Sequence, residues 1–369
     1  MAGASAAYEL SARSRVALLE RESQPGYHST GRSAALFSEA YGPEQVRALS
    51  TGGKPFFLSP PDGFAEHGIL TPRGAMFLGR PDQESQLQTV FEESRRLVDT
   101  IRRIDAAEAL ACVPVLRAGY VGGGVLEPDA MDIDVHALHQ GYLRGLRARG
   151  GTVVTDAEVT ALTNDGADWR VGTTAGEFNA PAVINAAGAW ADVIGDMAGA
   201  EAIGLVPKRR TAILFDPPDG VDSDAWPLVV DVDENFYFKP DAGKLLGSPA
   251  DETPVPPCDV QPEDLDVAVA VDRIQTAADL PVRRIDHRWA GLRSFVPDKT
   301  PVVGYDPKVA GFFWLAGQGG YGIQTAPGLG RLTAALAAGM TVPADLADLG
   351  VSAAALSPAR LSSSQNRKE

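Results

Sequence analysis

The chain has 369 residues, enough for two domains that each bury a core of their own. Its formal net charge of -15 disfavours a broad surface for a phosphate backbone, so no nucleic-acid partner is predicted. The two cysteines lie far apart without disulfide or zinc spacing, and no uncharged apolar run reaches the roughly 18 residues of a membrane-spanning helix. These features predict a cytoplasmic α/β protein without a metal or a transmembrane segment, and they leave peripheral contact with the inner membrane open.

The first stretch, residues 1–20, is typical of the second half of a dinucleotide-binding βαβ unit. A small-residue helix is predicted over residues 1–13, followed by a strand over residues 16–19 that ends in Glu20. In a complete unit, an apolar strand and a G-x-G-x-x-G turn precede the helix. Only the last glycine is present, as Gly3, and Glu20 lies 17 positions after it, near the distance at which an acid binds ribose hydroxyls. Taken alone, this stretch favours plain α/β scaffold over a nucleotide site.

The next segments combine a long loop with predicted helices. Residues 21–41 are rich in Gly, Ser, Thr and Arg, which is typical of a loop that contacts a polar ligand. Helices are predicted over residues 45–58, over residues 84–104, and from Asp132 or Asp134 to Gly150. His136 and His139 lie three positions apart on the last helix, but without a nearby third ligand they predict no metal site.

The second half of the chain alternates strands with glycine-rich turns. Strands are predicted at residues 153–162, 169–173 and 177–187, and the last leads into a small-residue turn at residues 185–190 that backbone could present to a cofactor. Residues 205–292 are predicted to be rich in β-strands. A basic triplet, Lys208 to Arg210, begins that region; such a triplet is more often solvated, but it could deliver one arginine to a carboxylate.

Near the C-terminus, a strand, a glycine-dense loop and a helix follow one another. The strand is predicted at residues 312–315, the loop at residues 316–322 and the helix at residues 327–340. This arrangement presents N–H groups and a positive helix end to an electron-rich ligand.

Together these segments resemble the family of FAD-dependent D-amino-acid oxidases and dehydrogenases, over essentially the whole chain. The sequence is most similar to the D-arginine dehydrogenase branch. The segments that carry the resemblance are residues 1–20, 29–35, 185–190, 207–210, 236–247, 291–295 and 317–322. It implies an α/β fold in which a Rossmann-like FAD-binding domain is interleaved with a substrate domain on a mixed, largely antiparallel sheet. The implied ranges are 1–41, 133–205 and 290–360 for the FAD domain, 42–132 and 206–289 for the substrate domain, and 361–369 for a frayed tail.

The resemblance also implies a cofactor site. Glu20 would bind the adenosine ribose, and Val159 would meet the adenine through its backbone. The complete implied set is Gly3, Glu20, Arg21, Ser29, Thr30, Gly31, Arg32, Ser33, Ala34, Val159, Gly188, Trp190, Gly320, Tyr321, Gly322, Ile323 and Gln324. Neither cysteine falls in a flavin motif, so the FAD is expected to be non-covalent.

For the substrate, the resemblance implies recognition of an amino acid. Arg210 and Arg293 match positions near its carboxylate, and Tyr41 and Tyr237 match tyrosines that close over it. The implied reaction is oxidation of a Cα–H next to an amine with hydride transfer to flavin N5. The imino acid is then hydrolysed to a 2-oxo acid and ammonia. Oxygen, a quinone and a carrier protein all stay open as the electron acceptor.

Two departures from the D-arginine branch change the expected substrate. Ala75 stands where that branch places an acid for the guanidinium, and Leu36 stands where it places a histidine. Losing a charge-assisted hydrogen bond costs roughly 1.5–3 kcal/mol. The sequence therefore predicts a preference for apolar or aromatic D-amino acids. The predicted pocket consists of Leu36, Ser38, Ala75, Leu228, Val230 and Gly320.

Two alternatives stay open. The first is a sarcosine or N-methyl-amino-acid oxidase, which shares the fold; such relatives often attach the flavin to a cysteine near the arginine segment, where this chain has Ser294. The second is an N-terminally truncated chain, as from a gene-model error, with impaired or no FAD binding and no activity. Loss of the first strand would leave backbone groups unpaired and remove two glycines that approach the pyrophosphate.

Overall fold

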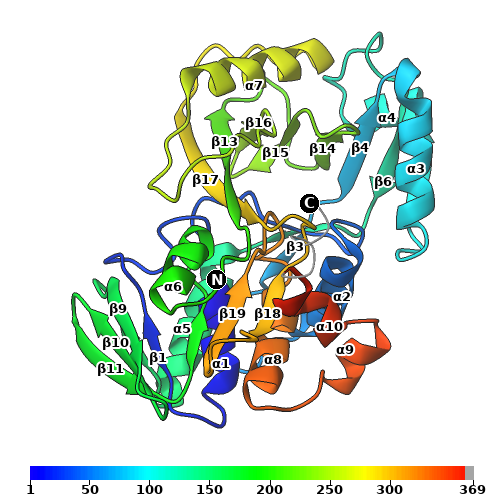
Figure 1. Ribbon diagram of the computed structural model, residues 1–369. Coiled ribbons are helices and arrows are strands. Elements are labelled where there is room, and N and C mark those ends of the chain that lie inside the picture. Colours follow the sequence, from blue (N-terminus) through cyan, green and yellow to red (C-terminus); the bar gives the residue numbers. More distant parts are fainter. Residues whose placement is uncertain (362–369) are drawn as a thin grey trace, which may run out of the picture.

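The structure, a computed structural model, describes residues 1–361 and shows two lobes (Figure 1). The lower lobe in that view is built on short parallel strands. Strand β1 (Ala17–Leu19) pairs in parallel with β8 (Thr152–Val154). Strand β12 (Val183–Asn185) pairs in parallel with β19 (Phe312–Ala316), whose other edge carries the antiparallel strand β18 (Val302–Tyr305). Parallel strands covered by helices are the usual core of an α/β lobe.

Small residues let the helices of this lobe approach one another closely. Helix α1 (Ala2–Leu10) lies against α5 (Val135–Ala148) and α8 (Ala326–Ala337). A Cβ on Gly330 of α8 would lie 3.0 Å from the backbone of Ser5, so glycine permits this approach. Because α1 is held on both sides, its N-terminus has a fixed place beside the strands.

Further elements complete the lower lobe. They are α2 (Glu44–Leu58), β9 (Val159–Asn164), β10 (Trp169–Thr173), β11 (Gly176–Ala180), η2 (Gly188–Trp190), α6 (Ala191–Met197), α9 (Ala344–Asp348) and α10 (Ala353–Leu356). A small antiparallel sheet has the order β2 (Leu36–Phe37), β7 (Met131–Ile133) and β3 (Leu70–Pro72).

The upper lobe is built on one mixed sheet of eight strands. In spatial order these are β17 (His287–Phe295), β13 (Val206–Phe215), β16 (Lys244–Ser248), β15 (Tyr237–Asp241), β14 (Leu228–Asp231), β4 (Ala75–Gly79), β6 (Gly123–Glu127) and β5 (Arg102–Asp105). Strands β14 and β4 pair in parallel, and the other neighbours pair antiparallel. The predicted α/β fold with a mixed, largely antiparallel sheet is confirmed, while the predicted domain boundaries stay a prediction.

Helices cover this sheet, and they include the clearest errors of the sequence prediction. The predicted helix over residues 84–104 is wrong beyond α3 (Glu84–Ser94), because its last residues form the edge strand β5. Leu97, an apolar residue within the predicted helix, is 48% exposed. The predicted β-rich region also contains α7 (Asp264–Ala277), which buries Val267, Ala270 and Ile274 against the sheet. The remaining helical segments of this lobe are η1 (Pro81–Gln83) and α4 (Ala106–Cys112).

Two predicted strands are each divided in the structure. Residues 153–162 hold the end of β8 and the start of β9, separated by a turn in which Asp156 has a φ of 54°. Residues 177–187 hold most of β11 and all of β12, with Pro181 between them. Proline interrupts strand pairing because it lacks an N–H donor.

The ends and surface of the described chain give three further results. Leu361, the first residue of the predicted frayed tail, is 9% exposed and packs in a hydrophobic cluster, so the prediction is wrong there. The rest of that tail, residues 362–369, lies outside the described residues. Over residues 1–361, no helix is both long and apolar enough to cross a membrane. The same residues contain no group of three or more His, Cys, Asp or Glu side chains arranged for a metal ion.

Candidate active site

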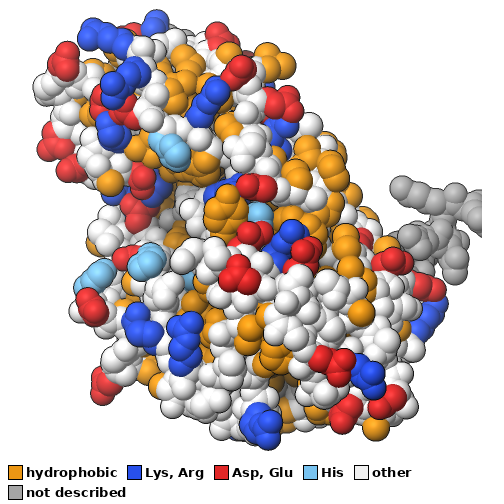
Figure 2. Space-filling view, turned by 90° about the vertical axis from the view of Figure 1, so that its left-hand side faces the viewer, with side chains coloured by type: hydrophobic (Ala, Val, Ile, Leu, Met, Phe, Trp, Pro, Cys, Tyr) orange, Lys and Arg blue, Asp and Glu red, His pale blue; other side chains and the backbone are white. Residues whose placement is uncertain are grey.

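A cavity of about 1340 Å³ lies between the two lobes, and Figure 2 shows the surface hollowed there. Its wall combines the N-terminus of α1, β1 and β12 from one lobe with β4, β13, β14 and β15 from the other. Ordinary small-molecule pockets measure about 300–1,000 Å³. The cavity therefore has room for an extended ligand together with a second small molecule.

The N-terminus of α1 opens into this cavity. Ala2, Gly3 and Ala4 line it, and no side chain caps the helix. The free N–H groups of a helix N-terminus attract anions such as a pyrophosphate. A Cβ on Gly3 would lie 3.3 Å from Ala186 Cβ and 3.4 Å from Leu18 Cδ1. Gly3 therefore leaves space where α1 passes between β1 and the segment after β12.

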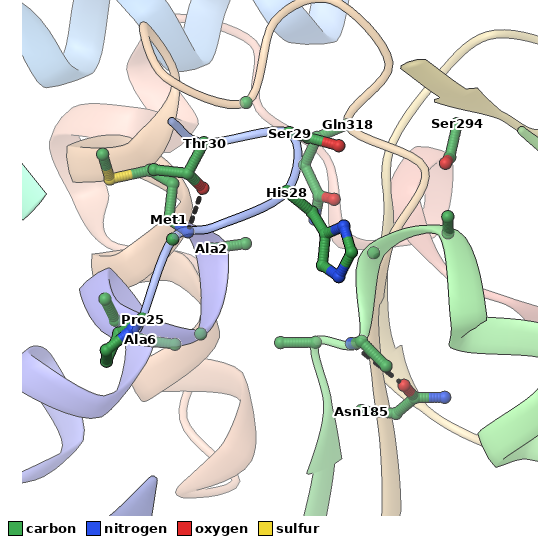
Figure 3. Close-up of a pocket in the computed structure, with 18 of the residues that line it drawn as sticks. Met1, Ala2, Ala6, Pro25, His28, Ser29, Thr30, Asn185, Ser294 and Gln318 are labelled. Carbon is green, nitrogen blue, oxygen red and sulfur yellow. Dashed lines mark hydrogen bonds between the residues drawn. The ribbon is translucent and has the colours of Figure 1, made fainter. Parts of the chain in front are cut away.

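The long loop that follows β1 forms one rim of the cavity. In Figure 3, His28 projects from this loop into the cavity, with Met1 and Thr30 on one side and Asn185 on the other. The amine of Met1 donates to Thr30 Oγ1 at 2.9 Å. His28 Nε2 lies 2.8 Å from Glu22 Oε1. Polar contacts within the loop and with Met1 thus hold it in place, and its hydroxyl and imidazole groups line the cavity.

Glu20 stands at the end of β1, on the cavity wall. Its Oε1 accepts the N–H of Glu22 at 3.1 Å, and the structure records no partner for Oε2 among the described residues. A carboxylate oxygen with free acceptor capacity suits a ribose hydroxyl. Val159 lines the same region at the start of β9.

The turn before α8 lines the cavity and contains donors without a recorded acceptor among the described residues. Within residues 1–361, the N–H groups of Gly322, Ile323 and Gln324 have no recorded acceptor. Gln318 also lines the cavity, and its Nε2 is buried without a hydrogen-bond partner among residues 1–361. Buried donors without partners are costly, which makes this turn a place where a ligand's acceptor atoms are expected.

These features fit the flavin dinucleotide that the sequence predicts. The helix end at Gly3 would face the pyrophosphate, Glu20 the ribose, and the donors around Gly322 the carbonyl-bearing end of the flavin. The cavity joins all three without interruption. Cys112 and Cys258 are absent from its wall.

The eight-stranded sheet supplies the second half of the wall through its register. Ala75 of β4 pairs with Leu228 of β14 on one side and with Glu127 of β6 on the other. Directly paired residues project from the same face of a sheet, so these three side chains form one row. Val230, two residues after Leu228, pairs with Tyr237 of β15. All five residues line the cavity.

The two candidate arginines differ in their partners. Arg210 Nε donates to the Asp251 carbonyl oxygen at 2.9 Å, and its Nη2 lies 3.3 Å from Glu252 Oε1. The guanidinium of Arg293 has no hydrogen bond or ion pair recorded with any residue of 1–361, and it lines the cavity. A Cβ on Gly320 would lie 2.9 Å from Arg293 Nη1, so this glycine leaves space for the guanidinium. Arg293 is therefore better placed than Arg210 to bind a carboxylate.

Two tyrosines stand in the electrostatic surroundings of Arg293. Tyr41 and Tyr237 both line the cavity and both act on the Arg293 charge, as does Glu234, which also lines it. Burial raises the pKa of Tyr41, which keeps its hydroxyl protonated at neutral pH. The Tyr41 ring lies 5.1 Å from that of Tyr321 in an edge arrangement. Protonated hydroxyls next to a guanidinium can donate hydrogen bonds to a bound carboxylate.

Glu127 adds a buried carboxyl group to this wall. Only 2% of the residue is exposed, and Ser38 Oγ donates to its Oε2 at 2.7 Å. Burial raises the pKa of Glu127 to about 7, although the Ser38 hydrogen bond lowers it. The side chain is thus poised between its neutral and charged forms near physiological pH.

The structure brings nearly all predicted site residues to one cavity. The two exceptions are Gly31 and Tyr321, which do not line it. Gly31 closes the long loop, since its N–H donates to the Gly26 carbonyl oxygen at 2.7 Å. The Tyr321 side chain packs against Tyr41 and Phe295 instead. The binding roles of the other predicted residues stay predictions.

Sequence reasoning left several polar residues of the cavity wall out of the predicted site, including four with ionisable or amide side chains. These four are His28, Glu127, Glu234 and Gln318. His28 and Gln318 lie within segments already selected for their glycine and hydroxyl content, so their position next to those motifs was a usable signal. Glu127 and Glu234 had no such signal, because strand pairing and the β14–β15 turn bring them to the cavity from outside every motif.

Comparison with known proteins agrees with this geometry. Residues 1–336 match the family model described as "FAD dependent oxidoreductase" (DAO). An uncharacterized oxidoreductase of Bacillus subtilis is 28% identical over 259 residues, covering 68% of this chain and 66% of that protein. Human mitochondrial sarcosine dehydrogenase is 27% identical over 244 residues, covering 62% of this chain but only 26% of that protein. The chain thus matches less than two thirds of the length of these relatives.

Among solved structures, glycine oxidase of Geobacillus kaustophilus has a TM-score of 0.81 at 22% identity and covers 95% of both chains. This similarity shows the fold. The predicted cofactor, FAD, is confirmed by the family, whereas the D-arginine dehydrogenase branch stays a prediction. The family model spans residues 1–336, most of the chain, so the chain belongs to the DAO family of FAD-dependent oxidoreductases.

Proposed function

We propose that this protein oxidises D-amino acids with apolar or aromatic side chains to 2-oxo acids and ammonia. The observation that supports this most is the guanidinium of Arg293, which lines the cavity without a recorded partner among residues 1–361. Tyr41 and Tyr237 lie in its electrostatic surroundings. A planar guanidinium with neighbouring hydroxyl donors suits the carboxylate of an amino acid.

Bound FAD would supply the hydride acceptor. The residues of the chain would hold the substrate: Arg293 binds the carboxylate, while Tyr41 and Tyr237 donate hydrogen bonds to it and exclude water from the pocket. Fixing the carboxylate also fixes Cα, so the C–H bond that breaks keeps one orientation. The imino acid that leaves the site is hydrolysed in water, which gives the 2-oxo acid and ammonia.

The side-chain pocket supports the proposed preference for apolar substrates. Leu228, Ala75 and Val230 present aliphatic groups to the cavity, and Leu36 lines it nearby. Below the Glu127 pKa of about 7, the carboxyl at the end of this row is neutral as well. An apolar side chain can then be buried without leaving a charge unpaired.

A substrate panel tests this preference. Below the Glu127 pKa of about 7, we expect D-leucine and D-phenylalanine to have higher kcat/KM than D-arginine, and their L-isomers to be poor substrates. Anaerobic loss of the flavin absorbance measures the reaction without any assumption about the electron acceptor. Faster oxidation of D-arginine than of both apolar substrates at that pH would contradict the proposal.

Oxidation of secondary amines is the second candidate, favoured by the similarity to human sarcosine dehydrogenase. The same panel separates the two functions when it includes sarcosine and N-methyl-D-leucine. A secondary-amine oxidase would oxidise the N-methyl compounds faster than their primary-amine counterparts. We expect the reverse order, because the proposed substrate carries a primary amine.

We further propose that the FAD is held without a covalent bond. Neither Cys112 nor Cys258 lines the cavity, and the arginine segment carries Ser294. Unfolding the yellow protein in denaturant and filtering it should release all flavin colour into the filtrate. Colour retained by the unfolded chain would contradict non-covalent binding. The flavin content before unfolding tests the alternative of a truncated chain with impaired or no FAD binding. For that alternative we would expect far less than one equivalent of flavin per chain.

A further inference from the structure

The resemblance to the D-arginine branch implies an acid where this chain has Ala75, and another carboxyl group lies next to that position. Glu127 is the direct cross-strand partner of Ala75, so its carboxyl group lies on the same face of the sheet, one strand further on. It lines the cavity together with Ala75 and Leu228. A substrate side chain that extends along this row past Ala75 would meet Glu127.

The surroundings of Glu127 supply hydrogen-bond donors but no recorded cationic partner among residues 1–361. Its recorded side-chain partner is Ser38, whose hydroxyl donates to Oε2 and accepts the N–H of Ala40 at 3.2 Å. The backbone N–H of Glu39 also bonds to it and lowers its pKa, whereas the charged groups that act on it, Glu39 and Asp129, are both acidic. Glu39 is itself paired with Lys54. On one side of β6, strand β4 contributes Ala75 and Phe77, which are uncharged. On the other side, β5 begins at Arg102, and that residue is already paired with Glu108.

We propose that Glu127 is the specificity-determining residue of the substrate pocket: its neutral form accepts an apolar side chain, and its carboxylate form binds a cationic one. This inference rests on the proposed function. A charge that is desolvated and has no cationic partner is unfavourable, so a substrate that brings a cation to it supplies the missing partner. Selectivity then depends on pH, because the carboxyl changes charge within the range in which enzymes work.

The experiment compares D-arginine with D-leucine in the FAD-loaded enzyme over a pH series that spans the Glu127 pKa of about 7. Both substrates carry the same α-amine and carboxylate, and the guanidinium is charged throughout, so the ratio of their kcat/KM values cancels every titration that they share. We expect the arginine-to-leucine ratio to rise about tenfold or more as pH increases, the size of one charge-assisted hydrogen bond. In Glu127→Gln the ratio should not change with pH.

Three further variants make the result specific to Glu127. Ser38→Ala removes a hydrogen bond that lowers the Glu127 pKa, so it should move the midpoint of the ratio to higher pH. Glu39→Gln removes an acid that raises that pKa, so it should move the midpoint to lower pH. Glu44→Gln, at the exposed start of α2, is the matched control and should leave the midpoint unchanged. A side chain with only a structural role would not move the midpoint in opposite directions.

The possible outcomes separate this inference from the proposed function. If D-leucine is oxidised but the wild-type ratio does not change with pH, the inference is wrong and the proposed function stands. The same holds if Glu127→Gln keeps the wild-type midpoint. If Glu127→Gln does not fold, the opposite shifts in Ser38→Ala and Glu39→Gln decide the question, and their absence overturns the inference. If neither amino acid reduces the flavin, the proposed function fails and the inference fails with it.

Discussion

Replacing Arg293 with methionine is expected to lower kcat/KM for D-leucine by about 10²-fold or more. The guanidinium lines the cavity with no recorded partner among residues 1–361, so a substrate carboxylate would be its partner. Each charge-assisted hydrogen bond to a carboxylate contributes roughly 1.5–3 kcal/mol, and a guanidinium can donate two in parallel. Arg293→Lys should recover only part of the loss, because an ammonium keeps the charge but lacks the planar fork.

The matched control lies on the same strand. Arg288 is exposed and pairs with Asp264, so Arg288→Gln should leave kcat/KM unchanged. Isoamylamine, which lacks the carboxylate of leucine, provides a second test. Arg293→Met should affect its oxidation far less than that of D-leucine. Equal effects on both substrates would mean that Arg293 maintains the fold of the site rather than binding the carboxylate.

Arg210→Met should have a smaller effect than Arg293→Met for a reason visible in the structure. Arg210 already donates to the Asp251 carbonyl oxygen and lies near Glu252, so its charge is partly compensated before a substrate arrives. The sequence places both arginines in similar roles. Their difference depends on residues 251 and 252, which reach Arg210 only through the pairing of β13 with β16 and the segment that follows.

Much of the cofactor half could be predicted because its signals are local. The helix at Gly3, the acid at Glu20 and the strand, loop and helix around Gly322 are each contained within about one supersecondary unit. A glycine pattern, an apolar strand and a helix start lie next to one another in the chain. The fold and the cofactor could therefore be predicted from short segments taken in chain order.

The errors come from segments in which local pattern and tertiary structure disagree. Residues 84–104 carry an apolar stripe of helical period, yet Ile104 is buried because β5 pairs with β6. An edge strand next to a helix can produce the same spacing of apolar residues by coincidence. Helix α7 was hidden for the opposite reason: its small buried residues, such as Ala270 and Ala277, give a weak apolar stripe.

The substrate half depends on long-range pairing, which no local pattern specifies. Leu228, Ala75 and Glu127 are far apart in the chain and become neighbours only in the order β14, β4, β6. The apolar members of this row were predicted through the family resemblance. Glu127 matched no motif, so its place in the wall emerges from the sheet register alone. The proposed specificity residue therefore depends on the fold rather than on any single segment.

Replacing Glu127 with glutamine is expected to remove a pH dependence of stability. Burial raises the pKa of Glu127 from 4.5 to about 7 in the folded chain, while the unfolded chain keeps the ordinary value. Well below pH 4.5 the carboxyl is protonated in both states. As pH rises from 4.5 to about 7, the unfolded state releases the proton before the folded state does. The free energy of unfolding therefore falls over this range. The predicted loss is roughly 3 kcal/mol by the time pH exceeds the folded-state pKa.

The measurement compares denaturant unfolding of wild type and Glu127→Gln, at the same FAD concentration, below and above this window. All other titrating groups are common to the two proteins, so the difference between their pH profiles isolates Glu127. As pH rises, the free energy of unfolding of Glu127→Gln should increase relative to that of wild type by roughly 3 kcal/mol. The pH profile of Glu44→Gln should run parallel to that of wild type. Parallel profiles for wild type and Glu127→Gln would show that the carboxyl is solvated in the folded protein. In that case a substrate would find no unpaired charge at the end of the pocket.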